Sequence, residues 1–415
     1  MILFICDNDV NSLLFYVANL ALKNCLIPIS PSISNNSLKK IISNFKPDII
    51  FSKRLLKSDK YVLLEHFGEY KILKIKKSQT QIHKDLSLLL STSGSSGNSK
   101  FVKLTYKNIL SNALAIKKYL KLNYSDSTIT TLPLNYSYGI SVINSHLLAD
   151  AKIHANKLTF FDLEFWKKIK LLGISNISGV PFHYEILHRV GVDKINFNKL
   201  KFCTQAGGKL REDLIKILVN KFVKFKKKFY IMYGQTEASP RISYINQKTL
   251  LKYPNSVGKA IPGGKIFINV KKKSIGEICY KGDNIYRGYS TERADLYKLK
   301  NIKILKTGDI GYKKNGLLFI LGRTSREAKI YGVRVNLDVL ENYLNNSRKL
   351  LSKCIFKNNK IYICTLNKKY KELLIKKLIY KDFDININSI IFVRLKKFPL
   401  MYNRKIDYKK LYEYL

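Results

Sequence analysis

MILFICDNDVNSLLFYVANLALKNCLIPISPSISNNSLKKIISNFKPDIIFS, residues 1–52, decides the fold class, because strand-like and helix-like segments alternate along it. The segments ILFICD, CLIPIS and PDIIFS are short apolar runs of the kind that form buried strands. Residues 12–24 and SLKKIISNF repeat apolar residues at helical spacing, and a Ser or Asp precedes the first of them as an N-cap. Strands that alternate with helices predict a parallel sheet covered by helices.

The same alternation continues over the next two hundred residues. Helices are predicted over 106–120, 165–173 and 210–222, and strands over TITTLPL (128–134), ISNISGVP (174–181), KFCTQAGG (201–208) and KKFYIMYG (227–234). The first of these strands is expected to enter an irregular segment, NYSYG (135–139). Strands that end repeatedly in Gly or Pro loops mark the carboxyl edge of an α/β sheet, where ligands usually bind.

The pattern of alternating strands and helices ends near Ser256. Short strand-like pieces follow one another closely to residue 324 and predict a β-rich subdomain. The remaining residues, 325–415, are predicted to form strand, helix, strand, strand, helix, strand, a small α+β domain. We therefore expect an α/β fold with a large N-terminal domain of parallel and mixed sheets over 1–324 and a small α+β domain over 325–415.

The charge of the chain is strongly positive, with 75 Lys and Arg against 29 Asp and Glu, a formal net charge of +46. Such a charge could indicate a nucleic-acid or membrane partner. Lysines are, however, spread over the whole length, and Ile, Asn, Tyr and Phe, which share AT-rich codons with Lys, are also plentiful. Codon composition thus explains the bias, and we expect no nucleic-acid partner, although the field would attract anionic substrates.

The remaining bulk features favour a cytoplasmic enzyme with no membrane partner. No apolar run reaches the roughly 18 residues that span a bilayer, and the N-terminus has neither the basic region nor the long apolar run of a signal peptide. None of the six cysteines forms a C-x-x-C pair. Scattered reduced thiols are therefore favoured over a metal site.

A loop of small residues, TSGSSGNSK, directly follows the apolar run LSLLLS. Successive backbone N–H groups in such a loop can curl around phosphate oxygens, and glycine permits the close approach. No Gly-Lys-Ser/Thr triplet ends the loop, so it is not a Walker A sequence, and a plain surface loop is the alternative. The candidate phosphate-binding residues are Thr92, Ser93, Gly94, Ser95, Ser96, Gly97 and Lys100.

Further candidates for nucleotide binding follow at strand ends. In YIMYGQTEAS (230–239), Tyr233 could stack on a base, Thr236 could bond a phosphate, and Glu237 could hold Mg²⁺. Asp309, in KTGD, could accept both hydroxyls of a ribose. Lys405 lies in FPLMYNRKIDYKKL (398–411), between a strand and a final helix. Four of these residues also have a purely structural interpretation. Tyr233 could be a core aromatic, Glu237 a helix-start carboxylate, Asp309 a turn residue and Lys405 a solvated lysine.

The order of these motifs resembles that of the adenylate-forming enzymes, the superfamily of acyl-CoA synthetases, luciferases and peptide-synthetase adenylation domains. TSGSSGNSK is similar to the family's phosphate loop, and YGQTE matches its Tyr-Gly-x-Thr-Glu. TGD (307–309), GRTSREAKIYGVRV (322–335) and FPLMYNRKID (398–407) follow in the family's order over nearly the whole chain.

The resemblance implies two half-reactions. A small-molecule carboxylic acid attacks the α-phosphate of ATP with Mg²⁺ present, and the thiol of CoA or of a phosphopantetheine carrier then displaces AMP. A ligase that charges a stand-alone acyl carrier protein, in surface polysaccharide or secondary metabolism, is one alternative. A catalytically impaired nucleotide-binding homologue is another.

The resemblance also assigns roles residue by residue. The loop from Thr92 to Lys100 would hold the β- and γ-phosphates, Thr236 the α-phosphate and Glu237 the Mg²⁺. Lys405 would stabilise the pentavalent phosphorus and the leaving charge, then swing away as the small domain rotates about Ser325. The residues expected at the adenine and ribose are Gly207, Gly208, Tyr233, Gly234, Asp309 and Arg323.

Several positions depart from the family's pattern. The chain begins later than full-length members do, Ser325 stands at the hinge in place of Asp, and Arg404 stands before the catalytic lysine in place of Gly. Amino-acid-activating members often carry an Asp where this chain has Tyr138 and Gly139, which favours a simple carboxylic acid. The expected acyl pocket, for which simple burial is the alternative, consists of Tyr136, Tyr138, Gly139, Val180 and Pro181.

Overall fold

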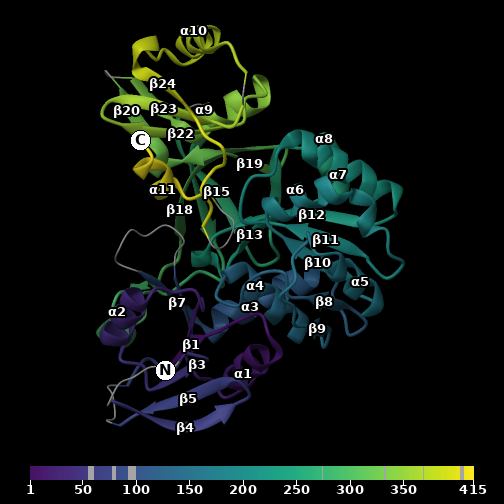
Figure 1. The fold of residues 1–415 in the computed structure, drawn as a ribbon, viewed down its shortest axis with the longest axis vertical. Helices are drawn as coiled ribbons and strands as arrows, with labels where there is room; N and C mark the ends of the chain where they lie inside the picture. Colours follow the sequence, from purple (N-terminus) through teal and green to yellow (C-terminus); the bar gives the residue numbers. More distant parts are fainter. Residues whose placement is uncertain are drawn as a thin grey trace.

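The computed structural model describes residues 1–54, 60–76, 81–91, 100–272, 274–330, 333–367, 369–401 and 406–415. Within these ranges the predicted α/β class is confirmed. Two large sheets are layered with helices, and smaller sheets from the C-terminal residues lie at one end, the top of Figure 1.

The first sheet has eight strands in the order β17-β7-β6-β2-β1-β3-β5-β4. Its centre, from β6 to β3, is parallel, as the first fifty residues predict, and antiparallel strands extend it on both sides. The edge hairpin β4–β5 is not predicted from the sequence, because β4 is largely exposed and its apolar residues do not alternate. The strands are β1 (Ile2–Ile5), β2 (Leu26–Ile29), β3 (Ile49–Ser52), β4 (Tyr61–Phe67), β5 (Tyr70–Ile75), β6 (Leu86–Ser91), β7 (Phe101–Thr105) and β17 (Tyr289–Ser290).

The second sheet has eleven strands in the order β15-β16-β18-β19-β14-β13-β12-β11-β10-β8-β9. Strands β8 to β12 run parallel, and from β12 onward neighbours are antiparallel. The strands predicted after Ser256 thus continue this sheet. They are β8 (Ser127–Ile129), β9 (Lys152–His154), β10 (Asn176–Gly179), β11 (Phe202–Gln205), β12 (Lys228–Gly234), β13 (Arg241–Asn246), β14 (Ser256–Ala260), β15 (Lys265–Lys272), β16 (Ile275–Lys281), β18 (Leu305–Lys314) and β19 (Leu317–Arg323).

Helices separate and cover the two sheets. α3 and α4 pack between them: Ile109 and Ile140 join the core of the first sheet, whereas Ile116 and Tyr138 join that of the second. α2 covers the outer face of the first sheet, and α5 to α7 cover that of the second. The helices are α1 (Val10–Ala21), α2 (Asn35–Phe45), α3 (Tyr106–Leu120), α4 (Ser137–Leu147), α5 (Leu163–Leu171), α6 (Pro181–Val190), α7 (Glu212–Lys224) and α8 (Gln247–Lys252).

Local sequence signals explain where several helices begin. The side chain of Asp9 accepts a hydrogen bond from the backbone of Ser12 and caps α1, as predicted. Thr105 and Asn108 form a reciprocal capping box at the start of α3. Pro181 occupies the first turn of α6, where its missing N–H is no loss.

The prediction of an irregular segment at NYSYG is correct for Asn135 and Tyr136 and wrong for the last three residues. The preceding strand ends already at Ile129, and α4 begins at Ser137, so Tyr138 and Gly139 lie in its first turn. No side-chain cap marks this start, which is why the sequence did not reveal it. A Cβ at Gly139 would lie 2.4 Å from the carbonyl oxygen of Pro133, so glycine is needed here for close packing.

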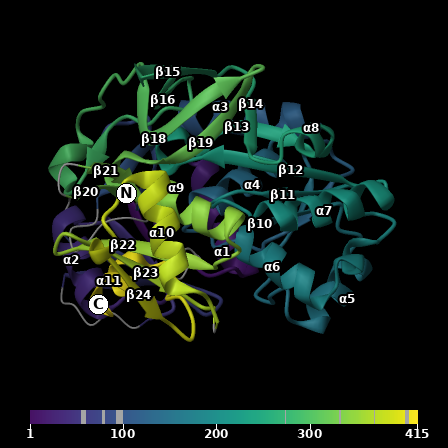
Figure 2. The same ribbon diagram turned by 90° about the horizontal axis from the view of Figure 1, so that it is seen from above.

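The C-terminal residues form a two-stranded and a three-stranded sheet with helices. The predicted succession of strands and helices is present, except that the strands β20 and β21, paired as a hairpin, stand in place of the first predicted strand. The elements gather at one end of the molecule, onto which Figure 2 looks down. None of the described helices is both long and apolar enough to cross a bilayer. The elements are β20 (Glu327–Ile330), β21 (Val333–Asn336), α9 (Leu337–Asn342), β22 (Ser352–Lys357), β23 (Lys360–Thr365), α10 (Glu372–Phe383), β24 (Ile390–Arg394) and α11 (Tyr408–Glu413).

Candidate functional site

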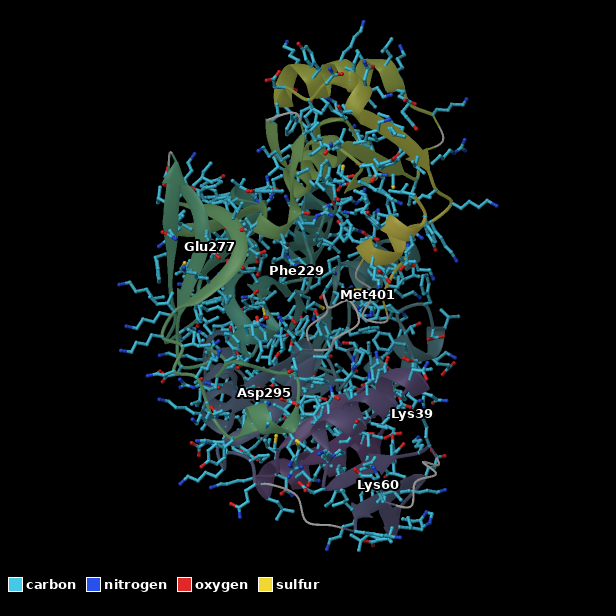
Figure 3. The ribbon with its side chains drawn as sticks, turned by 90° about the vertical axis from the view of Figure 1, so that its left-hand side faces the viewer. Lys39, Lys60, Phe229, Glu277, Asp295 and Met401 are labelled. Atoms are coloured by element: carbon cyan, nitrogen blue, oxygen red, sulfur yellow. The ribbon has the colours of Figure 1, made fainter. Side chains whose placement is uncertain are left out.

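Part of the predicted site lies outside the described residues. This part comprises Arg404, Lys405 and the predicted phosphate-binding residues Thr92, Ser93, Gly94, Ser95, Ser96 and Gly97. The two ends of the glycine loop are described: Ser91 and Phe101 are partners in the antiparallel pair β6–β7, and Lys100 is exposed beside them. Met401, just before the segment with Lys405, lies where the C-terminal elements face the N-terminal ones (Figure 3).

Glu237 lies next to the base of the glycine loop. Strand β17 pairs with β7, placing Tyr289 opposite Val102. The hydroxyl of Tyr289 donates to Glu237 Oε1 at 2.9 Å. Burial and the Glu237 carboxylate raise the pKa of the Tyr289 phenol, which therefore keeps its proton and remains a donor. The structure thus brings the predicted Mg²⁺ ligand to the strand that follows the predicted phosphate loop.

Thr236 opens a short 3-10 helix, Thr236–Ala238, directly after β12. Its hydroxyl oxygen lies 3.2 Å from that of Ser137, which starts α4. Two hydroxyl groups from segments 99 residues apart therefore lie side by side. Hydroxyls both donate and accept, so this pair could bond a phosphate oxygen.

Asp309 is brought together with two other predicted residues. The hydroxyl of Tyr233 donates to Asp309 Oδ2 at 2.6 Å, and Arg323 Nε lies 3.2 Å from Oδ1. Asp309 and Arg323 are direct partners across β18 and β19, so Asp309 belongs to a strand and does not close a turn. Each carboxylate oxygen keeps acceptor capacity beyond these bonds, which a ribose hydroxyl could use.

The environment of Asp309 is largely desolvated, since only 5% of the residue is exposed. Burial raises the pKa of the Asp309 carboxyl, while the Arg323 guanidinium and the Tyr233 hydroxyl counteract part of that rise. Burial and the nearby Asp309 raise the pKa of Tyr233 well above its ordinary value. The phenol therefore stays protonated and acts as the donor.

The predicted adenine-binding glycines contact three of the predicted acyl-pocket residues. A Cβ at Gly207, where φ is +86°, would lie 2.5 Å from the Tyr136 hydroxyl and 3.1 Å from Val180 Cγ1. A Cβ at Gly208 would lie 3.1 Å from Pro181 Cγ. The two glycines that follow β11 therefore pack so closely against the starts of α4 and α6 that a Cβ would be crowded there.

Gly207→Ala is expected to lower carboxylate-dependent pyrophosphate release about 10- to 100-fold, because Tyr136 must move and a displacement near 1 Å can have that effect on a reaction rate. The positive φ adds about 1–2 kcal/mol of backbone strain. Gly191→Ala is the matched control: its φ is +103°, and nothing lies within 4 Å of a Cβ there. We expect that control to lower the melting temperature but to leave the rate unchanged. Equal rate losses in both variants would contradict the prediction.

Gly139, Gly234 and Ser325 lie away from these contacts, whereas the ring of Tyr138 lies edge-on to that of Tyr136, with the ring centroids 6.3 Å apart. Tyr138 is buried, and its hydroxyl donates to the carbonyl oxygen of Thr204 at 3.0 Å. A Cβ at Gly234 would lie 1.7 Å from the carbonyl oxygen of Pro240, so its lack of a side chain serves the close approach of β12 to the following turn. Ser325 is exposed in a 3-10 helix, Thr324–Arg326.

Sequence reasoning missed two residues at this site, Ser137 and Tyr289. Ser137 carried a weak signal, since it lies next to Tyr136. Tyr289 carried none, because it is 52 residues from its partner Glu237.

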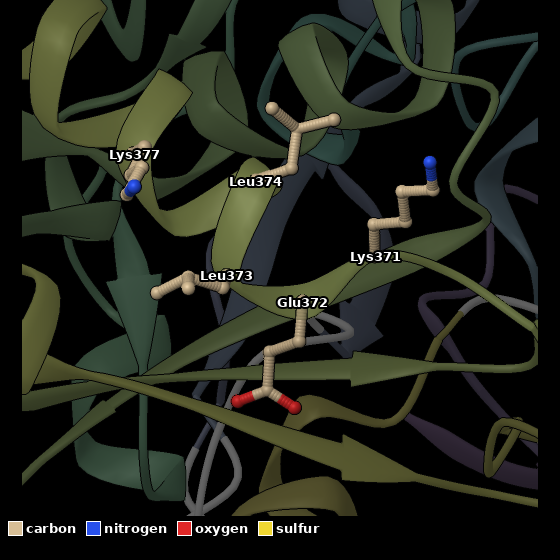
Figure 4. Close-up of a pocket in the computed structure, with 5 residues that line it drawn as sticks. All are labelled: Lys371, Glu372, Leu373, Leu374 and Lys377. Atoms are coloured by element: carbon tan, nitrogen blue, oxygen red, sulfur yellow. The ribbon is translucent and has the colours of Figure 1, made fainter.

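Two further observations bear on bound groups. Among the described residues, no cluster of three or more His, Cys, Asp or Glu is arranged to hold a metal. Mg²⁺ commonly takes one or two carboxylates together with substrate phosphates and water, so Glu237 fits such an ion. A surface pocket of about 380 Å³ at the start of α10 (Figure 4) contains none of the predicted residues; it is lined by Lys371, Glu372, Leu373, Leu374 and Lys377.

Comparison with known proteins gives one family. The family model described as AMP-binding enzyme matches residues 1–290. A D-alanine--D-alanyl carrier protein ligase of Staphylococcus epidermidis is 24% identical over 421 residues, covering 93% of this chain and 84% of that protein. A probable 4-coumarate--CoA ligase 3 of Dictyostelium discoideum is 28% identical over 358 residues, covering 80% of this chain and 62% of that protein.

Solved structures share the fold. The o-succinylbenzoate CoA synthetase MenE of Bacillus subtilis, in complex with its acyl-adenylate intermediate, superimposes with a TM-score of 0.75 at 18% identity. That match covers 99% of this chain and 87% of the other. Klebsiella oxytoca NpsA gives a TM-score of 0.79 at 15% identity, with 100% and 88% covered.

Proposed function

The chain belongs to the AMP-binding enzyme family, a family of adenylate-forming ligases, and on that premise we propose that it activates a small-molecule carboxylic acid with ATP and transfers the acyl group to a thiol. The observation that carries this proposal is the meeting of Tyr233, Asp309 and Arg323 around one buried carboxylate. It joins YGQTE to TGD, 76 residues further along the chain, and to the arginine on the strand that pairs with TGD. A fourth motif, the glycine loop, is connected through Glu237: its carboxylate accepts a hydrogen bond from Tyr289, whose strand pairs with the strand that follows the loop.

In the first half-reaction, a carboxylate oxygen of the acid attacks the α-phosphorus of ATP. The bond from that phosphorus to the oxygen bridging to the β-phosphate breaks, and pyrophosphate leaves with the electron pair. Thr236, with Ser137 beside it, would bond the α-phosphate oxygens. Lys405 would stabilise the charge that develops there. Mg²⁺ held by Glu237 would neutralise part of the triphosphate charge.

The nucleotide would be held by residues of several neighbouring strands and of the loops that adjoin them. Gly207 and Gly208 would flank the adenine together with the ring of Tyr233. Asp309, with Arg323 assisting, would accept the ribose hydroxyls. The loop between β6 and β7, with Lys100 at its end, would hold the β- and γ-phosphates.

In the second half-reaction, a thiolate attacks the carbonyl carbon of the acyl-adenylate and AMP leaves. Residues 325–415 would form the small domain that turns about Ser325 between the two steps and carries Lys405. CoA is one candidate acceptor, and the pantetheine of a carrier protein is the other. Relatives named as D-alanyl carrier protein ligases support the carrier, and a relative named as a CoA ligase supports CoA.

The test is pyrophosphate release from ATP with a panel of carboxylic acids, followed by thioester formation with CoA or a pantetheine-loaded carrier. We expect at least one acid to give release well above that of the Lys405→Ala variant. Release no higher than that variant with every acid would refute the proposal and favour a catalytically impaired nucleotide-binding protein.

A further inference from the structure

Arg241, the first residue of β13, is a buried cation without an acidic partner among the described residues. Only 2% of the residue is exposed. Its guanidinium lies over the ring of Tyr138, 4.3 Å from the centroid, and Nη2 donates to Ser141 Oγ at 3.2 Å. The Nε atom is buried with no hydrogen-bond partner in the part of the chain that the structure describes.

Two other arginines among the described residues, the buried Arg293 and the half-buried Arg326, are arranged differently. Arg293, 8% exposed, contacts both carboxylate oxygens of Asp48, at 3.1 and 3.2 Å. Arg326 pairs with Asp338 and Glu341. An unpaired buried charge is costly, and stacking on a tyrosine offsets only part of that cost. Arg241 is therefore poorly compensated by its described neighbours.

The position of Arg241 links this unpaired charge to the proposed acyl site. Its stacking partner Tyr138 follows Tyr136 in the first turn of α4. Its hydrogen-bond partner Ser141 lies one helical turn after Ser137, whose hydroxyl lies beside that of Thr236. Tyr138 also bonds to Thr204, three residues before Gly207. Arg241 thus contacts the start of α4, the helix that places the predicted acyl-pocket residue Tyr138 beside the hydroxyl pair of Ser137 and Thr236.

We propose that Arg241 determines substrate specificity by pairing with a second anionic group on the acid, at the end opposite the carboxylate that is activated. The inference rests on the proposed function and names its substrate class, a dicarboxylic or otherwise diacidic compound. The buried positive charge also disfavours an α-amino acid, whose ammonium it would repel.

The experiment compares acids of equal length with and without the second charge. Succinate, glutarate and adipate are tested against their half-amides, with D-alanine included, by ATP-dependent pyrophosphate release. For at least one pair we expect kcat/KM to be at least about tenfold higher for the diacid, because a site built for a polar group rejects the analogue that lacks it. D-Alanine should give no release. Arg241→Met should bring the ratio close to one, and Arg241→Lys should retain part of it.

Arg293→Met is the matched control, since it removes a buried but paired arginine away from this site. It should lower the melting temperature without changing the preference for diacids. Equal or better turnover of half-amides by the wild-type protein would overturn the inference, even if Arg241→Met does not fold. Release with monoacids or D-alanine alone would overturn it while leaving the proposed function intact. If no acid in the panel supports pyrophosphate release, both the inference and the proposed function are overturned.

Discussion

Lys405→Ala is expected to reduce carboxylate-dependent pyrophosphate release about 10²- to 10³-fold, the usual effect of removing one charge-stabilising group from a transition state. The reason is electrostatic: negative charge builds up on the α-phosphate and the departing pyrophosphate, and Lys405 would be the cation that meets it. The affinity for ATP should change much less. Initial rates of release, together with ATP binding by calorimetry, separate the two effects.

The matched control for this prediction is Lys409→Ala, four residues further along the chain. Lys409 is exposed on α11, and its replacement by Ala removes the same charge from the same region. We expect its rate to stay within twofold of the wild type, and both variants to melt at the same temperature. A Lys405→Ala enzyme that retains more than a third of the wild-type rate would rule out the proposed role.

Glu341→Ala is expected to lower the free energy of unfolding by about 3–5 kcal/mol, because it leaves buried charges without their partner. Glu341 is 4% exposed. Its carboxylate pairs with Arg326, accepts from Lys353 Nζ at 3.1 Å and from the Cys354 backbone at 2.8 Å, and accepts from the Tyr408 hydroxyl at 2.9 Å. Denaturant unfolding of the full chain measures the loss.

This network matters for function because of where it lies. Arg326 directly follows the proposed hinge at Ser325 and stacks on Tyr408, 3.9 Å from the ring centroid. Tyr408 begins α11, three residues after Lys405. Asp382→Ala is the control, since the half-exposed Asp382 lies 4.0 Å from Arg348 and accepts a hydrogen bond from the Tyr343 hydroxyl, and exposed pairs of this kind contribute about 1 kcal/mol or less. Equal losses in the two variants would contradict the importance of the Glu341 network.

The sequence predicted much of the fold because the signals are local. The alternation in residues 1–52 correctly placed β1, α1, β2, α2 and β3, and residues 106–120 correctly gave α3. The failures are also local. α4 begins without a side-chain cap and contains Gly139, so nothing within the segment marks it as a helix. The sequence did not predict α6, although Pro181 stands at its start, because a proline after an apolar run also indicates the end of a strand.

The sequence likewise predicts only part of the candidate site. By itself, the sequence determined the residue types and their order: a glycine loop, YGQTE, TGD and a lysine near the end. Such patterns depend on neighbours along the chain, so they can be seen without a structure. The roles of the glycine-loop residues and of Lys405 stay predictions, since those residues lie outside the described ranges.

Only the tertiary structure decided which of these residues meet. Tyr233 and Asp309 are 76 residues apart, and they bond because the antiparallel strands β13, β14 and β19 connect β12 to β18 within one sheet. The lack of a described acidic partner for Arg241 is likewise a property of the packed core and not of its neighbours in sequence. Periodicity and capping act over a few residues, whereas strand order and the burial of a charge depend on the whole chain at once.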